Sequence, residues 1–257
     1  MSSKPSRSDL LYVRMRNDIL SLALAPGSAL RLPALSERYA VGVTPLRECL
    51  NRLSTDQLVV MEHNKGFRVA ELSLQDLLDL ERSRNAIEGD LFLRAIEQGT
   101  DAWEAGVIGA YHHLSVLPPI SILGTDAELA LWNRRHAAFH AALIAKVDAP
   151  WMLHFHGQIT DQLQRYQSFI QTGLRDLSIS HPDMAPKAAE IYATALSSEP
   201  HQMLYDVALA RDLIAAREVL EGHVNLSIQA FTELSKLVPA DTPIAETLRQ
   251  PFAEMSL

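Results

Sequence analysis

The residues from Val41 to Leu53 constrain the fold of this chain more than any other stretch. Thr44 can accept a hydrogen bond from the first turn of a helix, and Pro45 suits the first helical position, where its missing N–H costs nothing. Apolar side chains then recur at spacings of three and four, at Leu46, Cys49, Leu50 and Leu53. This spacing predicts an amphipathic helix with one buried face.

The neighbouring segments predict a small domain around that helix. A shorter helix is expected just before it, over Ala34–Ala40, and residues 41–43 leave room only for a tight turn. Two β-rich segments follow, Leu58–Glu62 and Phe67–Leu72, with Gly66 in a connection that is expected to need a positive φ. Together these elements make a winged helix-turn-helix, whose second helix enters the DNA major groove. The alternative is a small α+β lobe that binds nothing.

Charge is divided unevenly along the chain. The whole sequence has a net charge of −8 at pH 7, which by itself argues against DNA binding. Residues 1–72, however, hold ten basic and seven acidic side chains, a net of +3, so the remaining residues carry −11. Because the positive charge lies where the winged helix is expected, the distribution restores DNA binding as the favoured function.

Composition indicates the cellular compartment in which the protein is expected. Cys49 is the only cysteine, so no intrachain disulfide can form, which fits a reducing environment. The first residues lack the apolar core of a signal peptide, and no apolar run approaches the length of a membrane span. We therefore expect a cytoplasmic protein that does not bind membranes.

Residues 73–257 show only helical patterns. Ser73 can cap a long helix that runs to about Gln98. Further helices are expected over about 101–117, 125–145, 150–172, 185–196, 198–210 and 212–237. Residues 173–186 contain Ser, Pro, Asp and Gly and predict a loop. The predicted fold is therefore mainly α, with a winged helix-turn-helix domain in residues 1–72 and an antiparallel helical bundle in residues 73–257.

Histidines supply the candidate metal ligands. His136 and His140 are four residues apart, so on a helix both imidazoles lie on one face and can present two nitrogens to one metal. His201 and His223, from later helices, are two further candidates. The alternative is that some of the ten histidines fall at helical spacing by chance.

Several motifs match a known family. The pair Pro26-Gly27, the Thr-Pro-x-Arg-Glu-x-Leu string that begins at Thr44, and Gly66 together resemble the DNA-binding half of the GntR family of bacterial transcription regulators. The rest of the chain carries Arg-x-x-x-Glu at Arg84 and Glu88, a Phe-His helix and two later histidines. It resembles FCD, the all-helical effector domain of the FadR subgroup.

Two departures from the common family pattern point to one branch. Gly42 and Val43 stand where most members have Ser-Arg, and His136 replaces the usual aspartate ligand. Both features are similar to the branch of the carbon-starvation-induced repressor, which regulates the catabolism of small carboxylates. The resemblance implies a repressor whose effector is a small organic acid, and we expect a short dicarboxylate.

The patterns and the resemblance together give the expected site residues. Contacts with DNA are expected from Arg31, Arg38, Thr44, Arg47, Arg52, Lys65, Gly66 and Arg68. Contacts with the effector are expected from Arg84, Glu88, Arg165 and Tyr166. One divalent metal, with zinc favoured over nickel or copper, is expected on His136, His140, His201 and His223. A homodimer is expected, because two-fold symmetry doubles the contacts with a pseudo-palindromic operator in double-stranded DNA.

Other interpretations stay open at this point. The histidine site could belong to a metal-dependent hydrolase-type enzyme, which would need a nearby base such as Glu88 or Asp90. The helical half could also serve only for dimerisation. For individual residues, Arg84 and Glu88 could form a simple surface ion pair, and Arg47 could pair with an acid within the fold.

Overall fold

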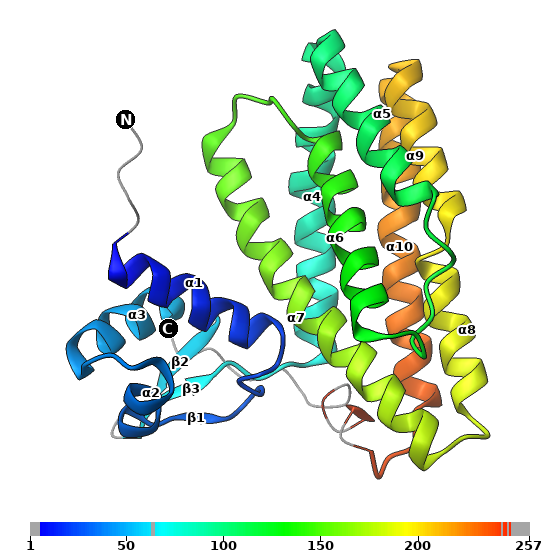
Figure 1. The fold of residues 1–257 in the computed structure, drawn as a ribbon. Coiled ribbons are helices and arrows are strands. Elements are labelled where there is room, and N and C mark those ends of the chain that lie inside the picture. The colour runs from blue at the N-terminus through cyan, green and yellow to red at the C-terminus, as the bar shows by residue number, and fades with distance from the viewer. Residues whose placement is uncertain (1–5, 63–64, 243, 246, 248–257) are drawn as a thin grey trace. The chain divides into compact units, whose positions relative to one another are not determined.

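The computed structural model describes residues 6–62, 65–242, 244–245 and 247. The chain divides into two compact units (Figure 1). The winged unit comprises Met1–Leu72 together with Asp161–Phe169, and the helical unit comprises Ser73–Thr160 and Ile170–Leu257.

The winged unit combines helices with a small antiparallel sheet. Its elements are α1 (Arg7–Leu20), β1 (Ala29–Leu30), α2 (Leu32–Tyr39), α3 (Val43–Thr55), β2 (Val59–Glu62) and β3 (Gly66–Val69). The strand order is β1-β3-β2, and Met61 of β2 lies opposite Phe67 of β3. Gly66 has a φ of +89°, as its place in the predicted turn requires. His63 and Asn64 of the same turn lie outside the described residues.

One hydrophobic core holds the winged unit together. The predicted inner face of α3 is completely buried and packs against α1, where Met15 and Ile19 are also fully buried. Each such side chain contributes about 1.5–3 kcal/mol by leaving water. The Sγ atom of Cys49 lies 3.5 Å from Sδ of Met15, and burial raises the pKa of the thiol to about 11. Cys49 is therefore a core residue and not a reactive one.

Helix α1 begins at Arg7 because Ser6 and Asp9 form a capping box. Two details of the winged unit differ from the prediction. The prediction that Thr44 caps α3 was wrong: Gly42 is the N-cap, and no side chain caps this helix. Strand β1 was not predicted, because two residues are too short for any periodic pattern.

The helical unit is an all-α bundle throughout its described part. Its helices are α4 (Leu74–Gln98), α5 (Asp101–Ser115), α6 (Asp126–Leu143), α7 (Pro150–Ser180), α8 (Ala185–Ala195), α9 (Ser198–Ala210) and α10 (Leu213–Leu237). Helix α10 packs against α4, α8 and α9, and α5 packs against α6 and α9 (Figure 1). Side chains of Ser73, Thr125 and Asp212 cap α4, α6 and α10.

The loop predicted for residues 173–186 was wrong in its first half, since α7 continues to Ser180. Ile170, Leu174 and Leu177 are buried at spacings of four and three, so the apolar stripe of the helix runs through the segment. A Cβ atom on Gly173 would lie 2.7 Å from Cδ1 of Ile244. This glycine therefore allows the close approach of the C-terminal segment and does not end the helix. Among the described helices, none has the length and apolar character needed to cross a membrane.

Candidate metal centre and nucleic-acid interface

Four histidines gather inside the helical unit. His136 and His140 lie one turn apart on α6, His201 lies near the start of α9, and His223 lies within α10. One ligand nitrogen from each residue lies within 4.8 Å of the other three. The structure therefore brings together all four residues that the sequence suggested.

Each of these imidazoles has a buried nitrogen that lacks a hydrogen-bond partner among the described residues. The atoms are Nε2 of His136, His140 and His201 and Nδ1 of His223. A buried polar atom without a partner costs about 1–3 kcal/mol, so four in one cluster require an explanation. One divalent cation bound to the four nitrogens would satisfy them all, and imidazole suits zinc, nickel or copper. The donor set therefore fits a metal.

Two of the imidazoles are oriented through their other nitrogen. Nδ1 of His140 lies 2.9 Å from Oε1 of Glu88, and Nδ1 of His201 lies 2.7 Å from the carbonyl oxygen of Ser197. A neutral imidazole that donates through Nδ1–H to such an oxygen presents the lone pair of Nε2 to a metal. The surroundings thus select the ligating tautomer of both side chains.

Burial also keeps the cluster in its neutral form. Desolvation lowers the pKa of His201 to about 3 and holds the pKa values of His136 and His223 well below their usual range. Desolvation lowers the pKa of His140 as well, although Glu88 opposes this shift. Since only neutral imidazole binds a metal, the cluster is ready for a cation at neutral pH.

Glu88 is the centre of a buried ionic network next to the histidines. Arg84 donates from Nε to Oε2 of Glu88 at 2.6 Å and from Nη1 to Oε2 of Glu81 at 3.3 Å. Nε2 of His156 on α7 lies 3.4 Å from Oε2 of Glu88. Burial opposes ionisation of Glu88, but Arg84 and then His140 outweigh it, so the pKa of Glu88 lies well below its usual range. Arg84 and Glu88 therefore do form a pair, but a buried one and not the surface pair considered above.

The other two predicted effector residues belong to a different unit from Arg84. Arg165 and Tyr166 belong to the segment of α7 that the winged unit includes. Arg165 donates to Oε1 of Gln162 and to the carbonyl oxygen of Ala70, at 2.5 Å in each case. Because Arg165 and Tyr166 belong to a different unit from Arg84 and the histidines, the proposed effector site uses only residues of the helical unit. His156 was not predicted, since its contact partner Glu88 is 68 residues away in sequence.

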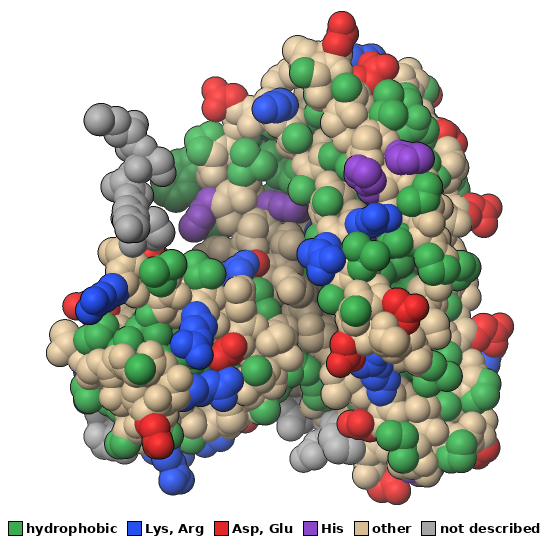
Figure 2. Space-filling view, viewed as in Figure 1, with side chains coloured by type: hydrophobic (Ala, Val, Ile, Leu, Met, Phe, Trp, Pro, Cys, Tyr) green, Lys and Arg blue, Asp and Glu red, His purple; other side chains and the backbone are tan. Residues whose placement is uncertain are grey.

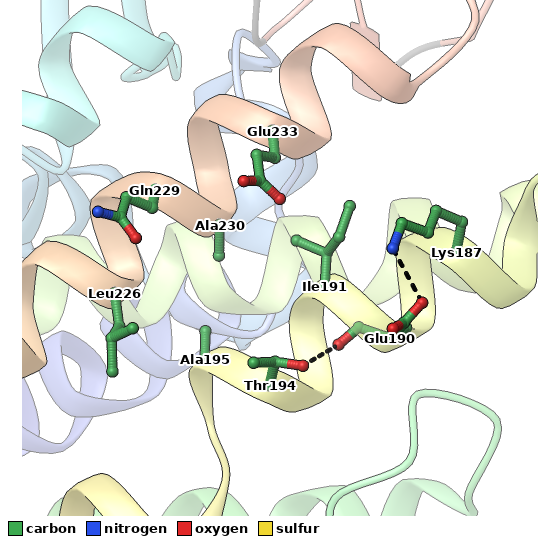
Figure 3. Close-up of a pocket in the computed structure, with 9 residues that line it drawn as sticks. All are labelled: Lys187, Glu190, Ile191, Thr194, Ala195, Leu226, Gln229, Ala230 and Glu233. Carbon is green, nitrogen blue, oxygen red and sulfur yellow. Dashed lines mark hydrogen bonds and ion pairs between the residues drawn. The ribbon is translucent and has the colours of Figure 1, made fainter.

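A surface groove of about 250 Å³ lies between α8 and α10 (Figure 3). Its lining residues are Lys187, Glu190, Ile191, Thr194, Ala195, Leu226, Gln229, Ala230 and Glu233. Lys187 is paired with Glu190 at 3.0 Å, one turn away on the same helix. No predicted metal or effector residue lines this groove, so it is distinct from the histidine cluster.

In the winged unit, α3 presents polar side chains on the side opposite its buried face. Thr44 and Arg47 are exposed there, and Arg31 and Lys65 are exposed elsewhere in the unit. Arg47 has no ion pair among the described residues, so the structure does not support the alternative that Arg47 pairs with an acidic residue within the fold. Figure 2 shows Lys and Arg side chains over the visible face of this unit. Exposed cations of this kind are available to phosphates and base edges.

Three other predicted DNA contacts are arginines that already have carboxylate partners in the winged unit. The pairs are Arg38–Asp18 at 3.0 Å, Arg52–Asp9 at 3.0 Å and Arg68–Glu62 at 3.3 Å. Exposed ion pairs of this kind contribute only about 0–1 kcal/mol, so these arginines can exchange partners. Among the described residues, Arg31 and Arg47 have no ion pair, so their guanidinium groups are available without breaking one.

Comparisons with known proteins identify the family. Residues 8–69 match the model for bacterial regulatory proteins of the gntR family, and residues 79–226 match the model for the FCD domain. The chain belongs to the GntR family. It is 35% identical to the HTH-type transcriptional repressor GlaR of Escherichia coli K12, across 83% of this chain and 90% of that protein. It is also 31% identical to the HTH-type transcriptional regulator BphR of Paraburkholderia xenovorans LB400, across 88% of this chain and 85% of that protein.

Solved structures of GntR regulators have the same fold. E. coli McbR/YncC superposes with a TM-score of 0.65 at 19% identity, over 90% of this chain and 99% of that chain. A GntR regulator from Rhodococcus sp. RHA1 superposes with a TM-score of 0.60 at 19% identity, over 89% of this chain and 99% of that chain. This GntR protein is therefore a DNA-binding transcriptional regulator with a winged helix-turn-helix and an FCD domain.

Proposed function

We propose that this GntR regulator is a metal-containing repressor that responds to a small organic acid. A homodimer binds a pseudo-palindromic operator near genes for the catabolism of a small carboxylate. The four histidines hold one divalent metal, with zinc favoured over nickel or copper. The effector binds next to this metal and changes the affinity of the protein for DNA. The repressor name of its relative GlaR supports the direction of control.

The observation that carries this proposal is the set of four unsatisfied, buried imidazole nitrogens. Four neutral imidazoles leave the full charge of a bound dication uncompensated. The neighbouring network of Arg84 with Glu81 and Glu88 supplies one net negative charge when both carboxylates are ionised. A positive charge therefore remains inside the bundle, and a buried charge of this kind attracts an anion. A carboxylate is the anion that an organic acid provides.

An enzymatic role has less support. A hydrolase needs a base beside its metal, but Glu88 is bonded to Arg84 and His140, and its pKa lies well below its usual range. A carboxylate of this kind is a weak base. Asp90 is paired with Arg94 at 2.6 Å. The relatives named above are transcription regulators, not enzymes.

Replacing Arg47 with alanine is expected to weaken binding to the operator by about 1–3 kcal/mol, because a guanidinium can form two hydrogen bonds with a guanine edge. Binding to random DNA should change much less. Lys65→Ala is the matched comparison: loss of a phosphate contact should lower the salt dependence by about one charge on both DNAs. Fluorescence titration at several salt concentrations measures both effects. Equal losses on operator and random DNA for Arg47→Ala would show that Arg47 does not read bases.

Replacing Arg84 with lysine is expected to weaken the binding of a short dicarboxylate about tenfold or more while the metal content stays unchanged. Lysine keeps the positive charge beside Glu81 and Glu88 but loses the planar fork that grips a carboxylate. Alanine is a poorer choice, since it would leave two buried carboxylates unpaired. Calorimetric titration with monocarboxylates and dicarboxylates of equal chain length measures the change. Arg94→Lys, on the exposed side of α4, is the control, and unchanged affinity in Arg84→Lys would exclude an effector contact.

A further inference from the structure

Helix α3 begins with an apolar side chain that the winged unit leaves half uncovered. Val43, its first residue, is 47% exposed, and Gly42 before it and Thr44 after it are also exposed. Val41, two residues earlier, packs against the hydrophobic core, whereas Val43 is not among the described side chains that pack there. Burial within the unit therefore does not account for a valine at this position.

Val43 lies on the face of α3 that carries Arg47. The two residues are four positions apart, so their side chains are neighbours on one face of the helix. Helix α3 is the second helix of the helix-turn-helix (Figure 1), and the first residues of such a helix contact base edges in the major groove. Because the family binds DNA, the surface around Val43 has a partner of known chemistry.

We propose that Val43 contacts the 5-methyl group of a thymine in the major groove and so selects a T·A pair at one position of the operator. In that groove guanine, cytosine and adenine present hydrogen-bond donors and acceptors, whereas thymine also presents a methyl group. The valine side chain has no donor or acceptor, so it would shield the polar groups of another base from water without replacing their hydrogen bonds. The thymine methyl group is the apolar group that a base edge offers to it.

Gly42 allows the start of α3 to come close to the base pairs. Its φ of −73° suits any residue, and a Cβ atom built on it would lie 4.0 Å from Cδ of Pro45, an ordinary contact distance. The fold therefore does not require glycine here, and a residue with a capping side chain would stabilise the start of the helix slightly better. Glycine keeps the approach to Val43 open, and a contact between apolar groups needs a separation of about 4.0–4.5 Å or less.

The spacing along α3 places this thymine near the base that Arg47 is proposed to contact. Four residues of a helix extend over about 6 Å, and successive base pairs are about 3.4 Å apart. For a helix that lies along the groove, the thymine is therefore about two base pairs from the guanine proposed for Arg47. This spacing rests on the proposed function, whereas the methyl contact needs only the DNA binding of the family.

Replacement of thymine by deoxyuridine removes only the methyl group and tests the proposal directly. The probe is a duplex that the full-length protein selects from a library with a random core, with its thymines then replaced one at a time. For the unmodified protein, replacement of the contacted thymine is expected to lower the affinity about fourfold, the value for one methyl group taken out of water. For Val43→Ala the same replacement should have almost no effect, because the partner of the methyl group is already gone. Fluorescence anisotropy titration measures each Kd.

Val13→Ala is the matched control. Val13 lies on α1 and is 50% exposed, so this substitution removes the same two methyl groups from an equally exposed valine on another helix. The control should keep the affinity of the unmodified protein and the full response to deoxyuridine. Both valines are exposed, so neither substitution should disturb the fold, which circular dichroism verifies.

A methylated cytosine gives a second measurement that changes no residue of the protein. A C·G pair in place of the T·A pair should weaken binding, and 5-methylcytosine should then recover about fourfold in affinity, because the methyl group returns to its position.

Three results would each overturn the proposal: no thymine that responds to deoxyuridine, an equal response in Val43→Ala, or no recovery with 5-methylcytosine. A library that yields no preferred sequence would overturn it together with the proposed operator. None of these measurements depends on an effector or on the identity of the metal. A regulator that reads the methyl group but responds to no organic acid would therefore contradict the proposed function and leave this inference standing.

Discussion

Replacing His140 with alanine is expected to remove the metal from the protein. The unmodified chain, purified without a histidine tag, should carry one divalent ion, whereas His140→Ala should carry less than about a tenth of that. The substitution removes one of four ligands and also breaks the link to Glu88. Elemental analysis of both proteins measures the difference. Effector affinity should fall together with the metal content, because the effector is proposed to bind beside the ion.

Two further variants calibrate that result. Glu88→Gln keeps all four imidazoles but weakens the acceptor that orients His140, and such outer partners are typically worth 10–100-fold in metal affinity. His113→Ala changes an exposed histidine on α5 and should have no effect. The expected order of metal loss is therefore His140→Ala, then Glu88→Gln, then His113→Ala. Metal-free wild-type protein that binds its effector with full affinity would contradict the proposed site.

The parts of the fold that follow from local spacing were predictable. The inner face of α3 was read from apolar residues three and four apart, and all of them are buried. The one long error, at residues 173–186, had a non-local cause. Gly173 resembles a helix end in sequence, but it serves a contact with Ile244, which lies 71 residues later. No pattern within the helix itself contains that information.

In the candidate site too, features that depend on local spacing were predictable and features that depend on distant contacts were not. The spacing of His136 and His140 indicates a shared helix face, whereas no spacing links His201 or His223 to that pair, and it is the family resemblance that favours these two over the other histidines. The contacts of Glu88 with His140 and His156 span 52 and 68 residues. Such contacts depend on how α4, α6 and α7 pack, so the sequence could suggest Glu88 as a site residue but not its contact with His140. In the structure Glu88 contacts and orients His140, whereas the sequence suggested that Glu88 contacts the effector directly.

Acidification is expected to destabilise the metal-free protein steeply below pH 6.5. Desolvation lowers the pKa values of the four clustered histidines in the folded state, whereas their pKa in the unfolded chain is about 6.5. Above pH 6.5 both states hold these imidazoles neutral, so the histidines add no pH dependence. As the pH falls below 6.5 the unfolded chain takes up protons first, and stability is lost until the folded pKa values are reached.

Each such histidine lowers the free energy of unfolding by about 1.4 kcal/mol per pH unit, so the four together lower it by up to about 5.5 kcal/mol per unit. Because a domain is stable by only about 5–15 kcal/mol, the metal-free protein should unfold within one to three units below pH 6.5. Bound metal should move this transition to lower pH, since protons must then compete with the ion.

Urea titrations of chelator-treated and metal-loaded protein between pH 8 and pH 5 measure how the free energy of unfolding changes with pH. His201→Gln should lower the slope of the metal-free protein by about a quarter, and His113→Gln should leave it unchanged. A stability that is flat between pH 7 and pH 5 without metal would mean that the four imidazoles are not held neutral in the folded protein.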